Sequence, residues 1–206
     1  MSYVPIMHLT VPAIWVSVIL AAIAASLLQR FVSGDKTGDW YWNAVALYIL
    51  TWKLSYILFN FEHFINMPLS LLYFNGGLPG HLLAVLLVMA YLFVARKKHK
   101  ELAEQAVFSV LLFFLAYQAI LTSFENNLLE AALHILLLII SIVSIRLIKR
   151  REDVPVGLML ALLFMLELLI LSAFGPLFTW QNATVIALAA LTISIYIRHE
   201  QKGQTL

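Results

Sequence analysis

The chain has no cysteine and few charged side chains. Without cysteine it can form no disulfide, no thiolate nucleophile and no cysteine-ligated metal site. Lysine, arginine, aspartate and glutamate together make up 12% of its 206 residues, whereas soluble domains contain about 25%. A soluble fold cannot bury the 63% of residues that are hydrophobic. The sequence therefore predicts an all-α polytopic membrane protein.

Seven apolar segments follow one another, and each predicts a membrane-spanning helix. Several are shorter than the roughly 20 residues that cross a bilayer, so only their centres are well defined by the sequence. A cleavable signal peptide requires a lysine or arginine before its apolar run. No such residue precedes the first segment, so we expect this segment to remain as a membrane helix. The segments are residues 11–28, 42–59, 82–95, 106–121, 128–147, 156–174 and 183–197.

The connectors between these segments alternate in charge. Every lysine and arginine except Lys53 lies in the connectors after the first, third and fifth segments, at the end of the fifth segment (Arg146), or after the seventh segment. The connectors 60–80, 122–127 and 175–182 contain neither residue. Positive charge marks cytoplasmic connectors, so the pattern predicts an outer N-terminus and a cytoplasmic C-terminus. Residues 1–206 are expected to form one seven-span domain that ends in a short cytoplasmic tail, residues 199–206.

Polar residues interrupt the second segment and continue beyond it. Lys53, Tyr56, Asn60 and His63 have the spacing of one helix face. Ionisable groups at membrane depth usually mark functional sites, so this face predicts a polar cavity that opens to the outer side. The alternative is that Lys53 pairs with a carboxylate such as that of Glu167, or extends to the membrane interface.

A glycine-rich stretch follows, with the sequence NGGLPGH at residues 75–81. Three glycines and a proline predict irregular backbone rather than helix. The free N–H groups of such backbone suit an anion such as phosphate. His81 would then open the third span near a helix N-terminus, where negative charge is favoured. The alternative is a tight outer loop with a capping histidine.

Two glutamates and a histidine lie in later segments. Glu130 and His134 are four residues apart, so they face the same way and could pair, titrate together or bind a metal; the sequence favours a hydrogen-bonded pair over metal ligands. Glu167 stands in a run of leucines and is expected to meet a cation or to stay protonated. A metal or proton site built from His63, His81 and His134 with nearby glutamates is a further alternative, which requires these residues to converge.

The stretch 53–100 resembles the prolipoprotein diacylglyceryl transferases. Its order of KLSYILFNF, PL, NGGLPGH and an apolar helix ending in ARKKHK is similar to the family's Arg-Leu/Ile-x-Tyr-Val-Leu-Phe, proline and Gly-Gly-Met/Leu-Ser-x-His-Gly-Gly. Weaker likeness at Leu129-Glu130-Ala131, Gly157-Leu158 and Gln181 extends the resemblance over most of residues 42–198. The family has seven spans with an outer N-terminus, the topology that the charge pattern predicts.

The resemblance implies an enzyme of the bacterial plasma membrane that transfers a diacylglyceryl group from phosphatidylglycerol to the lipobox cysteine of a prolipoprotein. It implies that His81 is the catalytic residue, with membrane phospholipid and a prolipoprotein or neighbouring membrane protein as partners. No cofactor, metal or nucleic acid is expected. Together with the polar face, it gives these substrate-binding residues: Lys53, Tyr56, Asn60, Asn75, Gly76, Gly77, Glu130 and Glu167.

Several arginines of the family pattern are replaced in this chain. Lys53 stands where the family has an arginine, Glu167 aligns with another, and residues 117–127 contain none. Two glycines that follow the family histidine are leucines here. Arginine binds phosphate through two parallel hydrogen bonds, which lysine and glutamate cannot reproduce. Two hypotheses therefore stay open: an active, divergent transferase, and a relative that binds a phospholipid, lipoprotein or partner membrane protein without chemistry.

Overall fold

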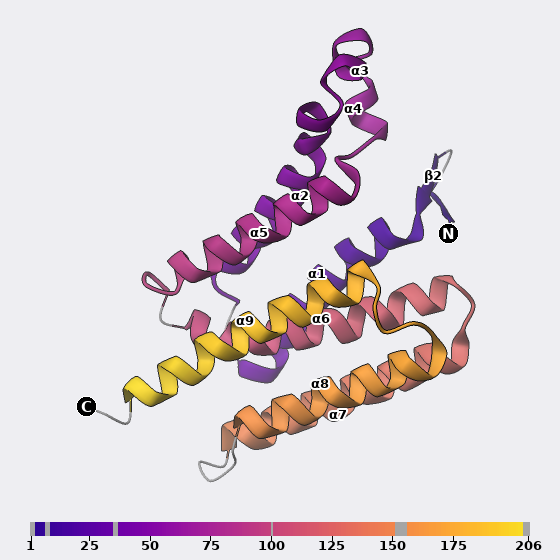
Figure 1. Ribbon diagram of the computed structural model, residues 1–206. Helices are drawn as coiled ribbons and strands as arrows, with labels where there is room; N and C mark the ends of the chain where they lie inside the picture. The colour runs from indigo at the N-terminus through magenta and orange to yellow at the C-terminus, as the bar shows by residue number, and fades with distance from the viewer. Residues whose placement is uncertain (1–2, 7–8, 35–36, 100, 151–155, 204–206) are drawn as a thin grey trace. The chain divides into compact units, whose positions relative to one another are not determined.

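In the computed structural model the chain is predominantly helical (Figure 1). Residues 3–6, 9–34, 37–99, 101–150 and 156–203 are described. They fall into two compact units: the first is Met1–Thr37 with Glu104–Leu206, and the second is Gly38–Ala103. The elements are β1 (Tyr3–Ile6), β2 (Leu9–Pro12), α1 (Ala13–Ser33), α2 (Asp39–Phe59), α3 (Phe61–Asn66), α4 (Ser70–Tyr73), α5 (Gly77–Ala95), α6 (Leu102–Phe124), α7 (Leu128–Arg150), α8 (Val156–Phe174) and α9 (Trp180–Gly203).

Six of the described helices are long and apolar enough to cross a membrane, namely α1, α5, α6, α7, α8 and α9. They are the helices of a polytopic membrane protein, as the composition predicts. The remaining predicted span lies in α2, whose 21 residues also have the required length. α2 is not among those six, and it contains Asp39, Asn43 and Lys53 besides several tyrosines and tryptophans.

The two ends of the chain differ from the predicted segments. β1 and β2 pair as an antiparallel hairpin in which Tyr3 lies opposite Pro12, so the first long helix begins at Ala13 rather than at residue 11. Pro12 is extended and directly precedes this helix, which suits a residue that has no N–H to donate. At the other end, α9 continues to Gly203 through residues 199–203, which the sequence placed in a tail.

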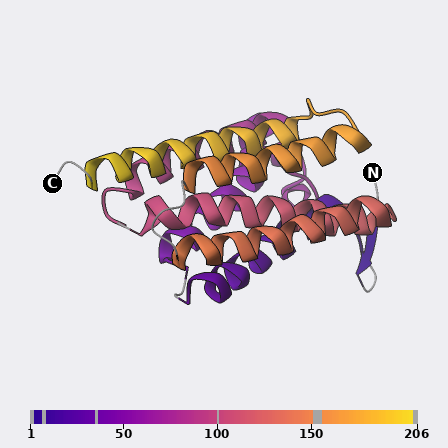
Figure 2. The ribbon, with the colours of Figure 1, turned by 90° about the horizontal axis from the view of Figure 1, so that it is seen from below.

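α6 is the central helix of the first unit. In its most apolar stretch, 67% of the residues are buried, whereas the corresponding share is 22–33% in the other five candidate spans. Its Phe114 and Tyr117 form a core with Ala21 of α1, Leu171 of α8 and Val185 of α9. Figure 2 shows the helices of this unit running along a roughly common direction. A helix as largely buried as α6 is in contact with neighbours over most of its surface.

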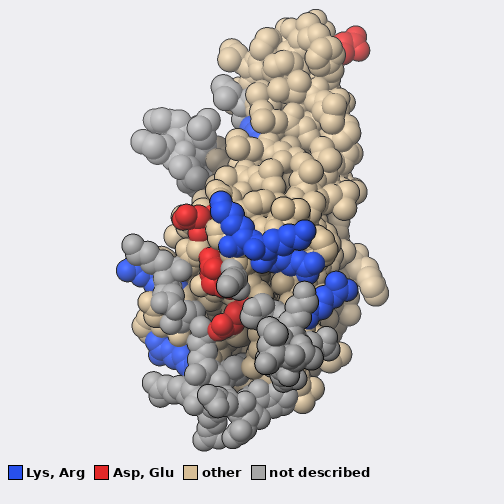
Figure 3. Space-filling model, turned by 90° about the vertical axis from the view of Figure 1, so that its left-hand side faces the viewer, with Lys and Arg blue, Asp and Glu red and all other residues tan. Residues whose placement is uncertain are grey.

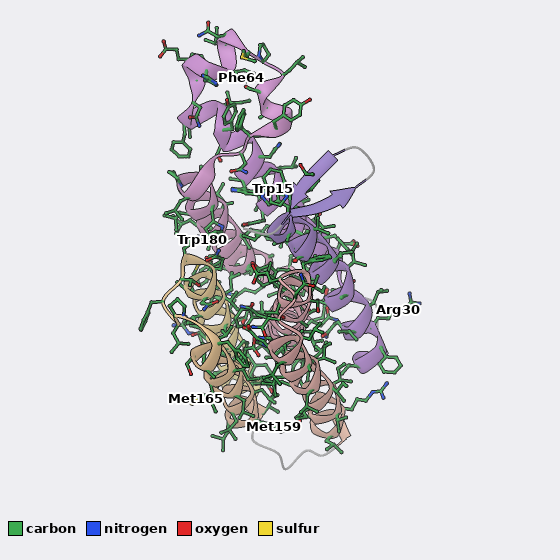
Figure 4. The ribbon with its side chains drawn as sticks, turned by 90° about the vertical axis from the view of Figure 1, so that its right-hand side faces the viewer. Trp15, Arg30, Phe64, Met159, Met165 and Trp180 are labelled. Atoms are coloured by element: carbon green, nitrogen blue, oxygen red, sulfur yellow. The ribbon has the colours of Figure 1, made fainter. Side chains whose placement is uncertain are left out.

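Basic side chains lie near the ends of helices in the first unit. Arg30, close to the C-terminus of α1, extends away from the helices (Figure 4). Arg146 of α7 donates from Nη2 to the carbonyl oxygen of Phe31 at 3.0 Å and lies over the Phe31 ring, 4.1 Å from its centroid. This contact joins the C-terminal part of α7 to that of α1.

The second unit is a hairpin of α2 and α5, connected through α3 and α4. The N–H of Gly76 donates to the carbonyl of Trp52 at 3.0 Å, so α5 begins level with Trp52. The seven residues of α2 after Trp52 extend beyond that level by about 10 Å, at 1.5 Å per residue. Few charged residues lie on the hairpin surface in view in Figure 3, as expected for a surface that faces lipid.

Candidate functional site

The glycine-rich stretch leads directly into a helix. The prediction of irregular backbone fits residues 74–76 and also Gly77, whose φ is 59°, but it is wrong from Leu78 onward, where α5 continues as a helix. Pro79 lies in the first turn of α5, where its missing N–H costs no intrahelical hydrogen bond. His81 therefore lies in the second turn of α5, not at its first residue.

The backbone N–H groups expected to hold an anion are used inside the protein. Gly76 donates to the carbonyl of Trp52, as described above, and Gly77 donates to Oδ1 of Asn75 at 2.8 Å. The N–H of Gly80 donates to the carbonyl of Gly76 at 3.0 Å. The prediction of a free anion-binding backbone at Gly76 and Gly77 is therefore wrong, because the loop and helix cap satisfy these groups internally.

The glycines instead allow α5 to lie very close to α2. A Cβ atom added at either Gly76 or Gly80 would collide with Oγ of Ser55. Ser55 is buried and donates from Oγ to the carbonyl of Trp52 at 2.8 Å. Small residues at this contact bring the two backbones together, as they do in many membrane helix pairs.

This close packing places His81 against Tyr48 of α2. Nδ1 of His81 and Oη of Tyr48 are 2.9 Å apart, and the two rings meet edge to face. His81 is buried, with 4% of its surface exposed. Tyr48 also stacks on Trp52, one turn further along α2. Sequence reasoning missed Tyr48, whose only signal is its spacing of four and seven residues from Trp52 and Ser55.

The predicted polar face of α2 is shorter than expected. α2 ends at Phe59, and Asn60 has φ −132° and ψ 43°, so Asn60 and His63 do not continue the face of Lys53 and Tyr56. Both Asn60 and His63 are exposed. A face that includes all four residues is therefore wrong, because the helix is interrupted before the last of them.

Lys53 and Tyr56 remain on the part of α2 that meets the start of α5. Lys53 follows Trp52, so it lies at the level where α5 begins, and it is half-buried. Tyr56 is 4% exposed and its ring stacks on Phe74. Its hydroxyl is buried and has no hydrogen-bond partner in the described part of the chain.

A second polar cluster lies in the first unit. Nδ1 of His134 on α7 is 3.0 Å from Oε2 of Glu167 on α8, and both side chains are fully buried. Nε2 of His134 is 3.6 Å from Oε1 of Glu130, so the two residues face each other from one helix face as predicted, but the predicted hydrogen bond between them is not formed. Asn127 donates from Nδ2 to Oε2 of Glu130 at 2.6 Å. His134 as the partner of Glu167 was not predicted, because 33 residues separate them in the sequence.

The predicted site residues are thus divided between the two units. Lys53, Tyr56, Asn60, Asn75, Gly76, Gly77 and His81 belong to the second unit, and Glu130 and Glu167 belong to the first. Among the described residues, no group of three or more histidines, aspartates and glutamates is arranged to hold a metal ion. Comparison with models of known protein families, with curated proteins and with solved structures finds no match for this chain.

Proposed function

We propose that this protein is a diacylglyceryl transferase of the prolipoprotein type, acting on phosphatidylglycerol in the outer leaflet of a bacterial plasma membrane. The observation that carries the proposal is the buried pair of His81 and Tyr48 near the start of α5, beside the level of Lys53. A positioned histidine and a cation at membrane depth suit proton transfer and phosphate binding.

The proposal includes seven spans, with α2 as one of them and the N-terminus outside. The charge pattern supports this topology, since lysines and arginines other than Lys53 lie in or beside alternate connectors, or after the last span. In this orientation α3, α4 and the start of α5 lie on the outer side. Phospholipid headgroups of the outer leaflet are found at that depth.

His81 acts as the acid and base in the proposed reaction. When Nδ1 carries a proton and donates it to Oη of Tyr48, Nε2 is the basic atom of the ring. Nε2 removes the proton from the lipobox cysteine, and the thiolate forms a C–S bond to the glycerol carbon of the diacylglyceryl group. The C–O bond to phosphate breaks, and the proton passes from His81 to the departing glycerol phosphate.

Lys53 and Tyr56 bind the phosphate in this proposal. A lysine ammonium neutralises the negative charge, and the Tyr56 hydroxyl is a buried donor that lacks a partner in the described part of the chain. Asn60 and Asn75 add amide groups at the same end of the hairpin. Lysine binds phosphate as a point charge, so this site holds its ligand with less directional control than an arginine would.

A second candidate function is phospholipid or lipoprotein binding without chemistry. It is favoured by Glu167, which aligns with a family arginine and is instead buried against His134. A carboxylate carries the same sign of charge as a phosphate and repels it, so Glu167 cannot take the role of that arginine. The remaining groups around Lys53 would then hold a ligand whose bonds stay intact.

Complementation of a bacterial strain depleted of its own diacylglyceryl transferase tests the first candidate. The wild-type chain is expected to restore growth and lipoprotein modification, and His81→Ala is expected to abolish both. His99→Ala, which changes a histidine beyond the other end of α5, serves as the matched control and should complement fully. Equal membrane levels of the three proteins, measured by immunoblot, exclude a loss of expression.

Failure of the folded wild-type protein to complement would contradict the transferase proposal. Lipid analysis of the purified protein then decides whether the second candidate holds. Phosphatidylglycerol that co-purifies with the wild type but not with Lys53→Ala supports binding without chemistry. Equal lipid content in both proteins contradicts that candidate as well.

A further inference from the structure

Glu130, His134 and Glu167 form a chain of titratable groups that leads from the edge of the first unit into its interior. Glu130 lies in the first turn of α7 and its side chain is 14% exposed. His134 follows one turn later and Glu167 lies on the neighbouring helix α8, both with 0% exposure. The imidazole therefore stands between a carboxylate with access to the surface and one without.

Two side-chain atoms of these three residues are buried without a hydrogen-bond partner in the described part of the protein. They are Nε2 of His134 and Oε1 of Glu167. Buried polar atoms almost always have a partner, and each exception calls for an explanation. Nε2 of His134 points to Glu130 Oε1 at 3.6 Å, slightly beyond hydrogen-bond range. A small change in the Glu130 side chain would complete a continuous path of hydrogen bonds.

The charges of the three groups favour proton uptake. With both carboxylates ionised and the imidazole neutral, the cluster carries two net negative charges in an apolar environment, which is energetically costly. One additional proton reduces this to one net negative charge. Asn127 donates a hydrogen bond to Glu130, whereas Oε1 of Glu167 has no partner in the described part of the protein, so the additional proton is placed on Glu167.

No other charged group offsets this negative charge through a described contact. Glu167 is the one titratable residue of α8, and the nearest arginine of α7, Arg146, lies 12 residues from His134, which is about 18 Å along the helix. Arg146 is also engaged with Phe31. The remaining described titratable side chains on α1, α6 and α9, and in the connector after α6, are those of Arg30, Glu104, Tyr117, Glu125, Tyr196 and Arg198.

We propose that Glu130, His134 and Glu167 form a proton-binding site, in which His134 carries protons between Glu130 and Glu167. A proton from the aqueous side binds Glu130 and moves from Oε1 to Nε2 of His134. The imidazolium then releases the proton on Nδ1 to Oε2 of Glu167. Glu130 is ionised again, His134 is neutral with its proton on the other nitrogen, and Glu167 is protonated. This site is independent of the transferase proposal, since it uses neither His81 nor Lys53.

Infrared difference spectroscopy of the full chain in lipid nanodiscs tests the binding step. The spectra are recorded while the pH is changed over the range in which glutamate and histidine titrate. We expect the wild type to show the C=O stretch of a protonated carboxyl group whose intensity follows pH. This signal should be lost in Glu167→Gln and retained in Glu125→Gln, which changes an exposed glutamate.

The relay step is tested by the rate at which deuterium replaces the proton on Glu167. Without a positioned transfer group this exchange is expected to slow roughly a hundredfold or more. Both His134→Leu and Glu130→Gln should show the slower exchange, whereas Glu125→Gln should exchange at the wild-type rate. Exchange that is equally fast in all four proteins would overturn the relay.

The absence of a titrating carboxyl signal in the wild type would overturn the proton site, as would its persistence in Glu167→Gln. Size-exclusion chromatography shows whether Glu167→Gln folds. Should it not fold, the titration midpoint of the wild type is compared with that of Glu130→Gln. The proposal requires a shifted midpoint in Glu130→Gln, because the charge of Glu130 acts on the shared imidazole, and an unchanged midpoint contradicts it.

Discussion

Nδ1 of His81 lies 2.9 Å from Oη of Tyr48, so a residue of α2 fixes the orientation of the histidine on α5. The contact is possible because Gly76 and Gly80 leave room for Ser55 between the helices. Orientation of a histidine by a second group also determines which ring nitrogen carries the proton. Tyr48 is therefore a positioning residue in the proposed reaction.

Replacement of Tyr48 by phenylalanine is expected to slow transfer while leaving KM nearly unchanged. The variant loses one hydroxyl, and a hydrogen bond of about 0.5–1.5 kcal/mol corresponds to a factor of up to about ten. The rate is measured in membranes with phosphatidylglycerol and a lipobox peptide. Nitrogen NMR of the His81 ring should show a changed tautomer ratio, a readout that does not depend on activity.

Tyr73→Phe is the control for that experiment, since Tyr73 is 69% exposed on α4. It should leave both the rate and the His81 spectrum unchanged. The positioning role is wrong if Tyr48→Phe leaves the His81 ring signals as they are in the wild type.

Replacement of Gly80 by alanine is expected to destabilise the hairpin of α2 and α5. The new Cβ collides with Oγ of Ser55, and overpacking of this kind costs about 1–3 kcal/mol. The free energy of unfolding is measured in mixed detergent micelles. Ser55→Gly in the same chain should recover a large part of the loss, because it removes the atoms that the methyl group meets.

Gly157→Ala provides the matched control for Gly80→Ala. A Cβ at Gly157 meets no atom within 4 Å, and alanine is the better helix former. The variant should be at least as stable as the wild type. A similar loss of stability in both alanine variants would show that close packing at Ser55 is not the cause.

Removal of one partner of the His134 and Glu167 pair is expected to be more damaging than removal of both. Each single change to leucine leaves a buried polar group alone, which costs about 3–5 kcal/mol. The double variant replaces the pair by apolar side chains and should be more stable than either single variant. A double-mutant cycle of unfolding free energies measures the difference, and strictly additive losses would contradict this coupling.

The absence of cysteine makes topology directly measurable by single-cysteine labelling. In the proposed orientation, Glu62→Cys and Glu125→Cys react in intact cells with a thiol reagent that does not cross membranes. Asp39→Cys and Lys97→Cys react only after permeabilisation. All four side chains are exposed, so access to reagent depends on the side of the membrane. Equal labelling of Asp39→Cys and Glu62→Cys in intact cells would show that α2 does not span.

The helical content could be predicted because apolar composition leaves few alternatives in a membrane. The predicted segments lie in the long helices, apart from residues 11 and 12, which pair in a short hairpin with the first residues of the chain. That hairpin depends on contacts between two short strands. Apolar residues next to a membrane span gave no indication of it.

Contacts between helices were harder to predict than the helices themselves. The proximity of Glu130 and His134 follows from a spacing of four residues within one helix, and it was predicted. The pairing of His134 with Glu167, and that of His81 with Tyr48, depends on how separate helices pack. The helical start of α5 was missed because proline and glycine disfavour a helix interior, whereas its first turn tolerates both.

The contact of Ser55 with Gly76 and Gly80 also limits how this hairpin can evolve. A side chain gained at Gly80 is tolerated only if position 55 first becomes glycine, and one gained at Gly76 also meets the Cα of Gly80, so the order of substitutions matters. Homologues that keep the same hairpin should therefore vary at these three positions together rather than one by one. Co-variation of these three positions would identify the helix contact in homologues even where the surrounding apolar residues differ in sequence.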